Sequence, residues 1–286
     1  MKRDFIDEAN GNLINNKLLE LEQYLDSDIL VYYGEIINGV EQRIKDICED
    51  LNNDQDKRQK LTVILTTPGG SLAPVERMVN IFRHFYNEVN YIIPNYAYSA
   101  GTILCMSGDN IYMNYYSVLG PIDPQVQNKD GNFVAALGYL DKVNEMIEKA
   151  KKNELTDAEF VILKDFDLAE LREYEQNKEL AINLLEKWLV QYKFKDWQKH
   201  RNGIVVTEED KKERARNIAK ELSDNNRWKT HGRPIDKDEL ESIQLKINDF
   251  EQDKVLSKLI GEYDCIMNEY VTKYGIKLFT HTRRFL

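Results

Sequence analysis

Glycine and proline are concentrated in one part of this chain, and their distribution constrains the fold more than any other sequence feature. Five of the six prolines and seven of the fourteen glycines lie between residues 68 and 138. Both residue types commonly end helices and strands, so this part of the chain must turn often. After residue 140 there are one proline and four glycines, which leaves the last half free to form long helices.

Apolar segments typical of strands and helices alternate through the first 113 residues. We expect strands over 29–33, 61–65, 89–93 and 110–113, and helices over 12–26, 40–51, 72–86 and 99–107. Strands and helices that alternate in this way form parallel sheets with right-handed crossovers. The pattern therefore predicts an α/β fold in which helices flank a parallel sheet.

The helical period dominates beyond residue 138. We expect helices over 139–151, 157–192, 208–222, 238–246 and 249–274, with an interruption at 225–234. The predicted organisation is an N-terminal helix (1–28), an α/β catalytic core (29–137) and a mainly helical C-terminal region (138–286). We expect this last region to complete the functional site and to supply the interface of a homo-oligomer.

The composition argues against several classes of protein. The chain has 39 Lys and Arg against 49 Asp and Glu, a net charge of −10, so we expect no nucleic-acid partner. The three cysteines form no CxxC pair, and no spacing typical of metal ligands is present, so we expect no metal and no cofactor. We find neither an apolar signal segment nor a run of 18 apolar residues, and expect a cytoplasmic protein without a membrane span.

The first candidate site is the turn 67–71, Thr-Pro-Gly-Gly-Ser, between a predicted strand and a predicted helix. Adjacent glycines allow positive φ and close approach of backbone N–H groups to a ligand. Such N–H groups at a helix start can stabilise a developing oxyanion. No GxxxxGK[ST] pattern follows, which argues against a phosphate-binding P-loop; an ordinary glycine turn is the alternative.

The second candidate site is the segment 96–102, Tyr-Ala-Tyr-Ser-Ala-Gly-Thr, which again follows a predicted strand and opens a helix. Ser99 stands at this turn, and its small neighbours Ala100 and Gly101 leave room for an acyl group. A helix N-terminus also favours negative charge nearby. The alternative is that Ser99 acts as an ordinary helix N-cap.

Two further segments, 119–125 (Leu-Gly-Pro-Ile-Asp-Pro-Gln) and 228–235 (Trp-Lys-Thr-His-Gly-Arg-Pro-Ile), complete a pattern. With the two turns, they resemble the serine dehydrogenase proteinase family, a relative of signal peptide peptidase A and of the Clp protease proteolytic subunits. The resemblance covers roughly residues 29–250. It implies a ClpP/crotonase-like fold, a first turn that supplies oxyanion-hole N–H groups, a nucleophilic serine and self-assembly into oligomers.

The general base is less clearly marked than the serine. The position at which Clp proteases carry a histidine is occupied here by Asp123 and Pro124, and Lys142 is the nearest match to the lysine of signal peptide peptidase A. We favour His231, because it lies in a loop flanked by glycine and proline, and an imidazole needs little tuning to act as a base at neutral pH. Asp123 could orient this histidine or simply hold its own turn.

The other three histidines are expected to have no part in catalysis. We expect His84 to be structural, and His200 and His281 to be exposed in polar surroundings.

These observations favour a serine peptidase that hydrolyses peptide or protein substrates through an acyl-enzyme on Ser99. Gly69, Gly70 and the N–H of Ala100 would stabilise the oxyanion. Two alternatives stay open: a crotonase-like acyl-thioester enzyme, and a catalytically inactive assembly or binding module of the same fold. The sequence does not identify any regulatory or unfoldase partner.

Overall fold

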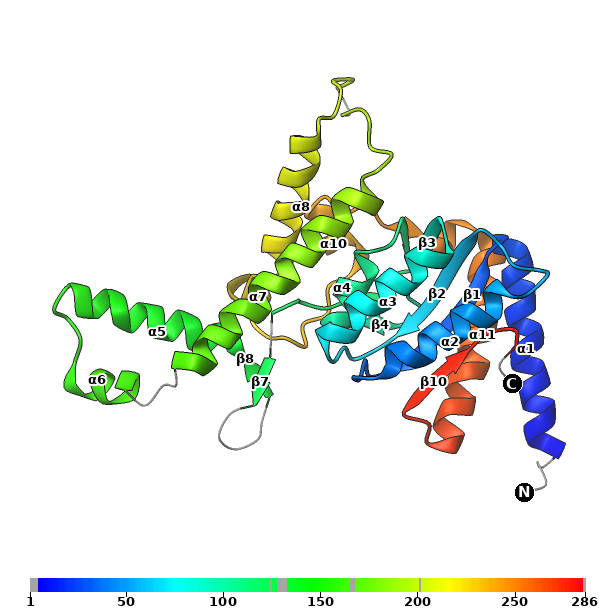
Figure 1. Ribbon diagram of the computed structural model, residues 1–286, viewed down its shortest axis with the longest axis horizontal. Coiled ribbons are helices and arrows are strands. Elements are labelled where there is room, and N and C mark those ends of the chain that lie inside the picture. Colours follow the sequence, from blue (N-terminus) through cyan, green and yellow to red (C-terminus); the bar gives the residue numbers. More distant parts are fainter. Residues whose placement is uncertain (1–4, 124, 128–132, 165–167, 201, 285–286) are drawn as a thin grey trace.

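The computed structural model describes residues 5–123, 125–127, 133–164, 168–200 and 202–284. Its main sheet has six strands in the order β10-β1-β2-β3-β5-β9 (Figure 1). The strands are β1 (Asp28–Gly34), β2 (Lys60–Thr66), β3 (Glu88–Ile92), β5 (Asn110–Met113), β9 (Asn248–Asp249) and β10 (Leu278–His281). All neighbouring strands are parallel except β10, which runs antiparallel to β1. The predicted α/β fold with a mostly parallel sheet is confirmed.

Two helices from opposite ends of the chain cover one face of the sheet, α1 (Phe5–Leu25) and α11 (Lys254–Tyr274). Leu18 of α1 and Ile260 of α11 belong to one buried cluster with Val31, Ile64 and Ile92 of the central strands. Ile64 pairs in register with both Val31 and Ile92. The sheet is thus apolar on this face because its central strands are buried on both sides, as parallel strands usually are.

The opposite face of the sheet is covered by α2 (Val40–Asn52), α3 (Leu72–Phe85) and the short α4 (Ala100–Cys105). Ile44 and Met78 pack there with Val63 and Tyr91. The same buried cluster continues into the later helices through residues such as Trp188. The helical region is therefore joined to the sheet by one continuous core.

The later helices form a layer beside the sheet and an arm that extends away from it (Figure 1). They are α5 (Ala136–Lys151), α6 (Asp157–Lys164), α7 (Leu168–Trp188) with its π-helical end Leu189–Lys193, α8 (Glu208–Leu222), α9 (Asn225–Trp228) and α10 (Lys237–Ser242). Figure 1 shows α5 and α6 in the arm and α7 leading back to the core. Within the described ranges, no helix has the length and apolar character needed to span a membrane.

Two small pairs of strands lie outside the main sheet. In one, β4 (Tyr96–Ala97) pairs in parallel with β6 (Val118–Leu119). In the other, β7 (Gln125–Gln127) pairs antiparallel with β8 (Phe133–Ala135). The first pair leads directly into the turn that carries Ser99, because β4 ends two residues before it.

The C-terminal part contributes more to the sheet than the sequence predicts. Strands β9 and β10 form its two edges, although neither segment has the alternating pattern of a strand. The expectation that His281 is exposed is wrong, because β10 places this residue in the interior. His281 bonds through Nδ1 to the Tyr263 hydroxyl (2.8 Å) and through Nε2 to Asn15 Oδ1 (2.7 Å). Burial lowers the pKa of His281 to about 4.

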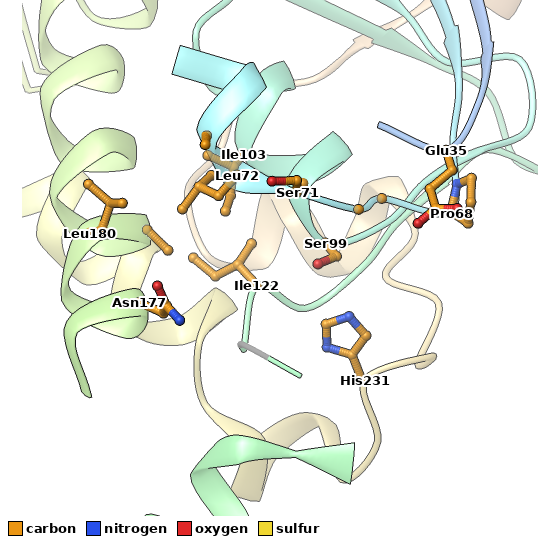
Figure 2. Close-up of a pocket in the computed structure, with 15 residues that line it drawn as sticks. Glu35, Pro68, Ser71, Leu72, Ser99, Ile103, Ile122, Asn177, Leu180 and His231 are labelled. Carbon is orange, nitrogen blue, oxygen red and sulfur yellow. The ribbon is translucent and has the colours of Figure 1, made fainter. Parts of the chain in front are cut away.

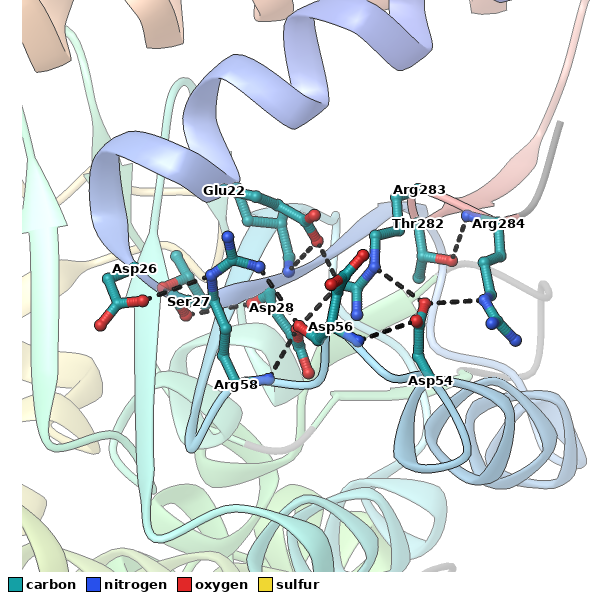
Figure 3. A network of polar contacts seen from close by, with 12 residues as sticks. Glu22, Asp26, Ser27, Asp28, Asp54, Asp56, Arg58, Thr282, Arg283 and Arg284 are labelled. Carbon is teal, nitrogen blue, oxygen red and sulfur yellow. Dashed lines mark hydrogen bonds and ion pairs between the residues drawn. The ribbon is translucent and has the colours of Figure 1, made fainter.

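A network of charged residues closes the amino end of the sheet (Figure 3). At its centre the Arg283 guanidinium contacts Glu22 (2.9 Å), Asp28 (2.7 Å) and Asp54 (3.1 Å). Asp28 also accepts a hydrogen bond from the Tyr86 hydroxyl (2.9 Å). The network ties the C-terminal segment to α1, β1 and the loop before β2.

Candidate active site

The glycine turn after β2 is held by its backbone in one conformation. Gly69 and Gly70 have φ of +100° and +134°. The Ile36 amide donates to Gly69 O (2.7 Å), and the Ser71 amide donates to Ile36 O (2.8 Å). A Cβ on Gly70 would lie 2.3 Å from Ile36 O, so the position requires glycine both for its φ and for this close approach.

The two glycine amides differ in what they bind. The Gly69 amide donates to Thr67 Oγ1 (3.0 Å) and is thereby used within the turn. The Gly70 amide has no acceptor among the described residues. Only the second of these N–H groups is therefore available to a ligand.

Ser99 sits at the start of α4 in a conformation that few non-glycine residues adopt, with φ 53° and ψ −117°. Its side chain makes no capping hydrogen bond, so the structure does not support an ordinary N-cap role. Positive φ at a serine costs on the order of 1–3 kcal/mol and is typical of functional sites. The hydroxyl is thus not bound by the backbone of its own helix.

The two turns lie directly against each other. A Cβ on Gly69 would be 2.8 Å from the Ser99 Cβ. The Thr67 amide donates to Tyr96 O (3.0 Å), and the Tyr98 amide donates to Thr67 O (3.0 Å). These backbone bonds fix the distance between the glycine turn and the serine turn.

Segments 119–123 and 231–235 bring the remaining candidate residues to the same place. Leu119 and Ile235 exchange two backbone hydrogen bonds of 2.9 Å. Asp123 follows Leu119 by four residues, and His231 precedes Ile235 by four, so antiparallel pairing places both at the same level. His231 Nδ1 lies 3.0 Å from Asp123 Oδ1. The Asp123 side chain is 2% exposed and that of His231 is 13% exposed, so solvent screens this pair weakly.

Ser99 and His231 both line a pocket of about 720 Å³. Gly69, Gly70 and Ala100 line it as well. Figure 2 shows the Ser99 hydroxyl and the His231 ring facing the same space, with the ring nitrogen that does not bind Asp123 turned toward the serine. The volume is within the usual range of sites that bind small ligands.

The structure does not bring Lys142 to this pocket. Lys142 lies on α5, is 55% exposed and pairs with Glu145 at 2.9 Å. Cys105, the cysteine nearest to Ser99 in the sequence, is buried, and burial raises the pKa of its thiol well above the usual value. Neither residue is placed to react with a ligand beside Ser99.

Sequence reasoning missed several residues that shape the site. The Thr102 hydroxyl lies 2.8 Å from Ala97 O and 2.9 Å from Gly120 O, and it accepts from the Gly120 amide (3.0 Å). It thereby fastens segment 119–123 to the helix that follows Ser99. A threonine in the first turn of an apolar helix is a weak signal for such a role. Asn177, Leu180 and Ala181 of α7 also line the pocket, and no local pattern marks them.

Comparison with known proteins supports the resemblance found in the sequence. Residues 37–276 match the sequence model of the family described as ClpP-like SDH-type serine proteinase. An uncharacterized protein of Methanocaldococcus jannaschii is 34% identical over 70 residues, which are 24% of this chain and 24% of that protein. A second uncharacterized protein of that organism is 26% identical over 188 residues, 66% of this chain and 52% of the relative. The chain thus spans a quarter to half of the length of these curated relatives.

Among solved structures, a mutant of the 1510-N membrane-bound stomatin-specific protease is similar to this chain. The sequence identity is 16% and the TM-score is 0.34, over 58% of this chain and 76% of that one. Membership of the family is shown by the sequence match over residues 37–276, not by this structural similarity. The match covers both turns and the segments that carry Asp123 and His231. The predicted family is confirmed: the chain belongs to the ClpP-like SDH-type serine proteinases.

Proposed function

We propose that this protein is a serine peptidase that hydrolyses peptide bonds through an acyl-enzyme on Ser99. The observation that carries the proposal is the buried Asp123–His231 pair, whose histidine shares a pocket with a serine that makes no capping bond. A nucleophile, a base and a group that orients the base are the parts that acyl transfer needs.

In the proposed reaction, Ser99 Oγ attacks the carbonyl carbon and its proton passes to His231 Nε2. The Asp123 carboxylate accepts the Nδ1–H of the ring, which leaves Nε2 free to take this proton. The resulting imidazolium then donates its proton to the peptide nitrogen as the C–N bond breaks. Water, deprotonated by the same histidine, hydrolyses the ester and releases Ser99.

The oxyanion would be held by the amides of Gly70 and Ala100. The Gly70 amide has no acceptor in the described part of the chain, and Ala100 is the first residue of α4, where amides lack helical partners. Gly69 contributes its conformation rather than its amide, because its N–H donates to Thr67. Each such donor is typically worth about 100- to 1000-fold in turnover.

The test is labelling with an alkyl fluorophosphonate, which reacts with an activated serine. We expect the wild-type protein to carry one adduct on the peptide that contains Ser99, and Ser99→Ala to carry none. His231→Ala should fold but label at least about 1000-fold more slowly, and Lys142→Ala should label normally. Lack of labelling in the folded wild-type protein would favour a binding module, and tight coenzyme A binding unaffected by Ser99→Ala would favour an acyl-thioester enzyme.

Three further properties belong to this proposal. The substrate is a peptide or a protein segment, the protein acts as a homo-oligomer, and it works in the cytoplasm. The division at residues 28 and 137 into helix, catalytic core and C-terminal region also stays a prediction. Sedimentation of the purified protein would test the oligomer directly.

A further inference from the structure

A second pocket, of about 740 Å³, lies among the helices of the C-terminal region. It is lined by Trp197 and His200 from the segment after α7, by Arg214 of α8, and by Gln244 and Lys246 from the segment after α10. Helices α7 and α8 lie side by side here (Figure 1). None of the described residues that line this pocket also lines the pocket beside Ser99, so the two are separate.

The wall that follows α7 is held by hydrogen bonds and ring contacts. Lys199 pairs with Val205 in an antiparallel bridge, and Trp197 Nε1 donates to Lys199 O (3.1 Å). The Trp197 ring packs against the main buried core, and the Arg214 guanidinium lies 4.1 Å from the centre of this ring. The backbone of Lys199 and the charged group of Arg214 are therefore held beside Trp197.

The wall that follows α10 contains a residue with a strained backbone. Gln244 has a φ of +67°, a left-handed conformation that glycine usually supplies after a helix. The next residue, Leu245, is fully buried, and its amide donates to Leu240 O (3.1 Å). Strain of this kind is typical of functional sites, and here it belongs to a turn that brings Gln244 and Lys246 to the pocket.

The lining is positively charged, although the chain as a whole carries a net charge of −10. Lys199, Arg214 and Lys246 contribute positive charges, and Glu241 is the one carboxylate among the described lining residues. Lys199 and Lys246 are exposed and form no ion pair with any described residue. Two lysine ammonium groups at this pocket are therefore available to an anion.

A further lysine adds to this positive region. Lys193 ends the π-helical segment that follows α7, and such segments are frequent at functional sites. Burial and, to a smaller extent, the charge of Lys246 lower the pKa of Lys193 to about 7. The two lysines are thus close enough to repel each other, and an anion bound at Lys246 would relieve this repulsion.

We propose that this second pocket binds the phosphate chain of a polyphosphate anion, either free inorganic polyphosphate or a nucleoside triphosphate. Linked phosphates carry enough charge to neutralise Lys199, Arg214 and Lys246 together, whereas one carboxylate would neutralise a single one of them. Because Arg214 already lies over the ring of Trp197, the charges are expected to bind the ligand more than stacking does. The inference does not depend on the proposed peptidase activity.

The first experiment is calorimetric titration of the full chain with tripolyphosphate in magnesium-free buffer. We expect one site per chain, with a Kd of about 100 μM or tighter at low salt. The Kd should rise at least about 10-fold between about 50 and about 300 mM salt, because exposed charges carry the interaction. A parallel titration with ATP identifies the source: equal affinities support inorganic polyphosphate, and tighter binding of ATP supports a nucleotide.

Single charge changes test the lining residues. Lys199→Gln and Lys246→Gln should each weaken tripolyphosphate binding about 10-fold, as expected for one lost charge-assisted contact. Glu241→Gln removes a repulsive charge and should tighten binding about 3-fold. Lys254→Gln is the matched control, because Lys254 is an exposed lysine at the start of α11, outside the pocket. It removes the same charge and should leave the Kd within about 2-fold of wild type.

Three results would overturn the inference in protein that circular dichroism shows to be folded. The first is an absence of tripolyphosphate binding at about 1 mM and low salt. The second is an equal loss of affinity in Lys246→Gln and Lys254→Gln, which would mean that the anion responds to overall charge alone. The third is weaker binding by Glu241→Gln, since removal of a carboxylate from an anion site cannot have this effect.

Discussion

The two ends of the sheet carry polar residues that are used in opposite ways. At the amino end, Arg283 is surrounded by three carboxylates and its side chain is 8% exposed. At the carboxyl end, the Gly70 amide has no acceptor and Ser99 makes no capping bond, as far as the chain is described. The amino end binds most of its polar groups to one another, although Glu22 Oε2 and Arg283 Nη2 have no hydrogen-bond partner among the described residues. The carboxyl end leaves a backbone amide and a serine hydroxyl uncommitted.

This difference predicts that the two ends respond differently to mutation. Groups that are paired with one another contribute to the free energy of unfolding, whereas uncommitted or strained groups are typical of binding and catalytic sites. Mutations at the carboxyl end should therefore change activity with little loss of stability. Mutations at the amino end should do the reverse.

The largest effect is expected from Asp123→Asn. An asparagine amide can donate to His231 Nδ1, which would place the ring proton on Nε2, where it cannot accept the serine proton. We expect labelling by the fluorophosphonate to slow about 10,000-fold. The free energy of unfolding, measured in urea, should change by no more than about 1 kcal/mol, since a single hydrogen bond is altered.

Asp56→Asn is the control, because Asp56 is exposed at the other end of the sheet. A labelling rate of Asp123→Asn within 10-fold of wild type would show that Asp123 only holds its turn. A large loss of stability in Asp123→Asn would contradict the expectation that the carboxyl end contributes little to stability.

The next largest effect is expected from Arg283→Met. Removal of the guanidinium leaves Glu22 and Asp28 in a buried place without the counter-ion they share, whereas Asp54 keeps its ion pair with Arg284 (2.8 Å). Loss of one partner from a buried ion pair typically costs about 3–5 kcal/mol of stability. Urea unfolding should show this loss, while the folded fraction labels Ser99 at the wild-type rate.

Arg172→Met serves as its control. Arg172 pairs with Glu175 on α7, where the two side chains are 57% and 47% exposed, so its removal should cost at most about 1 kcal/mol. Equal losses in the two arginine variants would mean that burial adds nothing to the network around Arg283.

A smaller effect is expected from His281 when the pH changes. Its pKa is about 4 in the folded protein and about 6.5 in the unfolded chain, so the unfolded chain binds more protons between these values. The stability that depends on neutral His281 is complete above pH 6.5 and is lost as the pH falls to 4. The loss amounts to about 3 kcal/mol.

Asp264 changes the free energy of unfolding in the opposite direction over the same pH range, because burial raises its pKa to about 6. Its contribution to stability therefore increases as the pH falls. The readout is therefore the difference between wild type and His281→Gln, in which the Asp264 contribution cancels. This difference in unfolding free energy should shrink by about 3 kcal/mol from pH 7 to pH 4. Parallel pH profiles would show that His281 keeps an ordinary pKa in the fold.

The elements that the sequence predicted best are those with local signals. Strands β1, β2, β3 and β5 and helices α2 and α3 were located within one or two residues, because each is an apolar run or helical stripe that ends at a turn. The turns that carry Ser99 and Gly70 could be located for the same reason, since both are visible as short motifs.

Features that depend on distant contacts could not be read in this way. His281 lies among Thr280, Thr282 and Arg283, which suggests an exposed tail until pairing with β1 and the acidic partners of Arg283 are known. The Asp123–His231 contact joins residues 108 positions apart, and the sequence left the role of Asp123 open. The wall made by Leu180 depends on where α7 crosses the pocket, which no local pattern determines.

The smallest effect on stability is expected at Ser99 itself. It tests most directly whether the carboxyl end of the sheet holds strained groups that do not contribute to stability. Its φ of 53° is strained for any residue with a Cβ, and its side chain makes no capping bond that a mutation could remove. Ser99→Gly relieves about 1–3 kcal/mol of strain in the folded protein. It also lowers the free energy of unfolding by about 0.5–1 kcal/mol, because glycine has greater conformational freedom in the unfolded chain. We therefore expect Ser99→Gly to be about 1 kcal/mol more stable than wild type in urea unfolding. Ser99→Ala keeps the Cβ and the strain, so its stability should match wild type; if the glycine variant is instead the less stable of the two, the serine turn stores no strain.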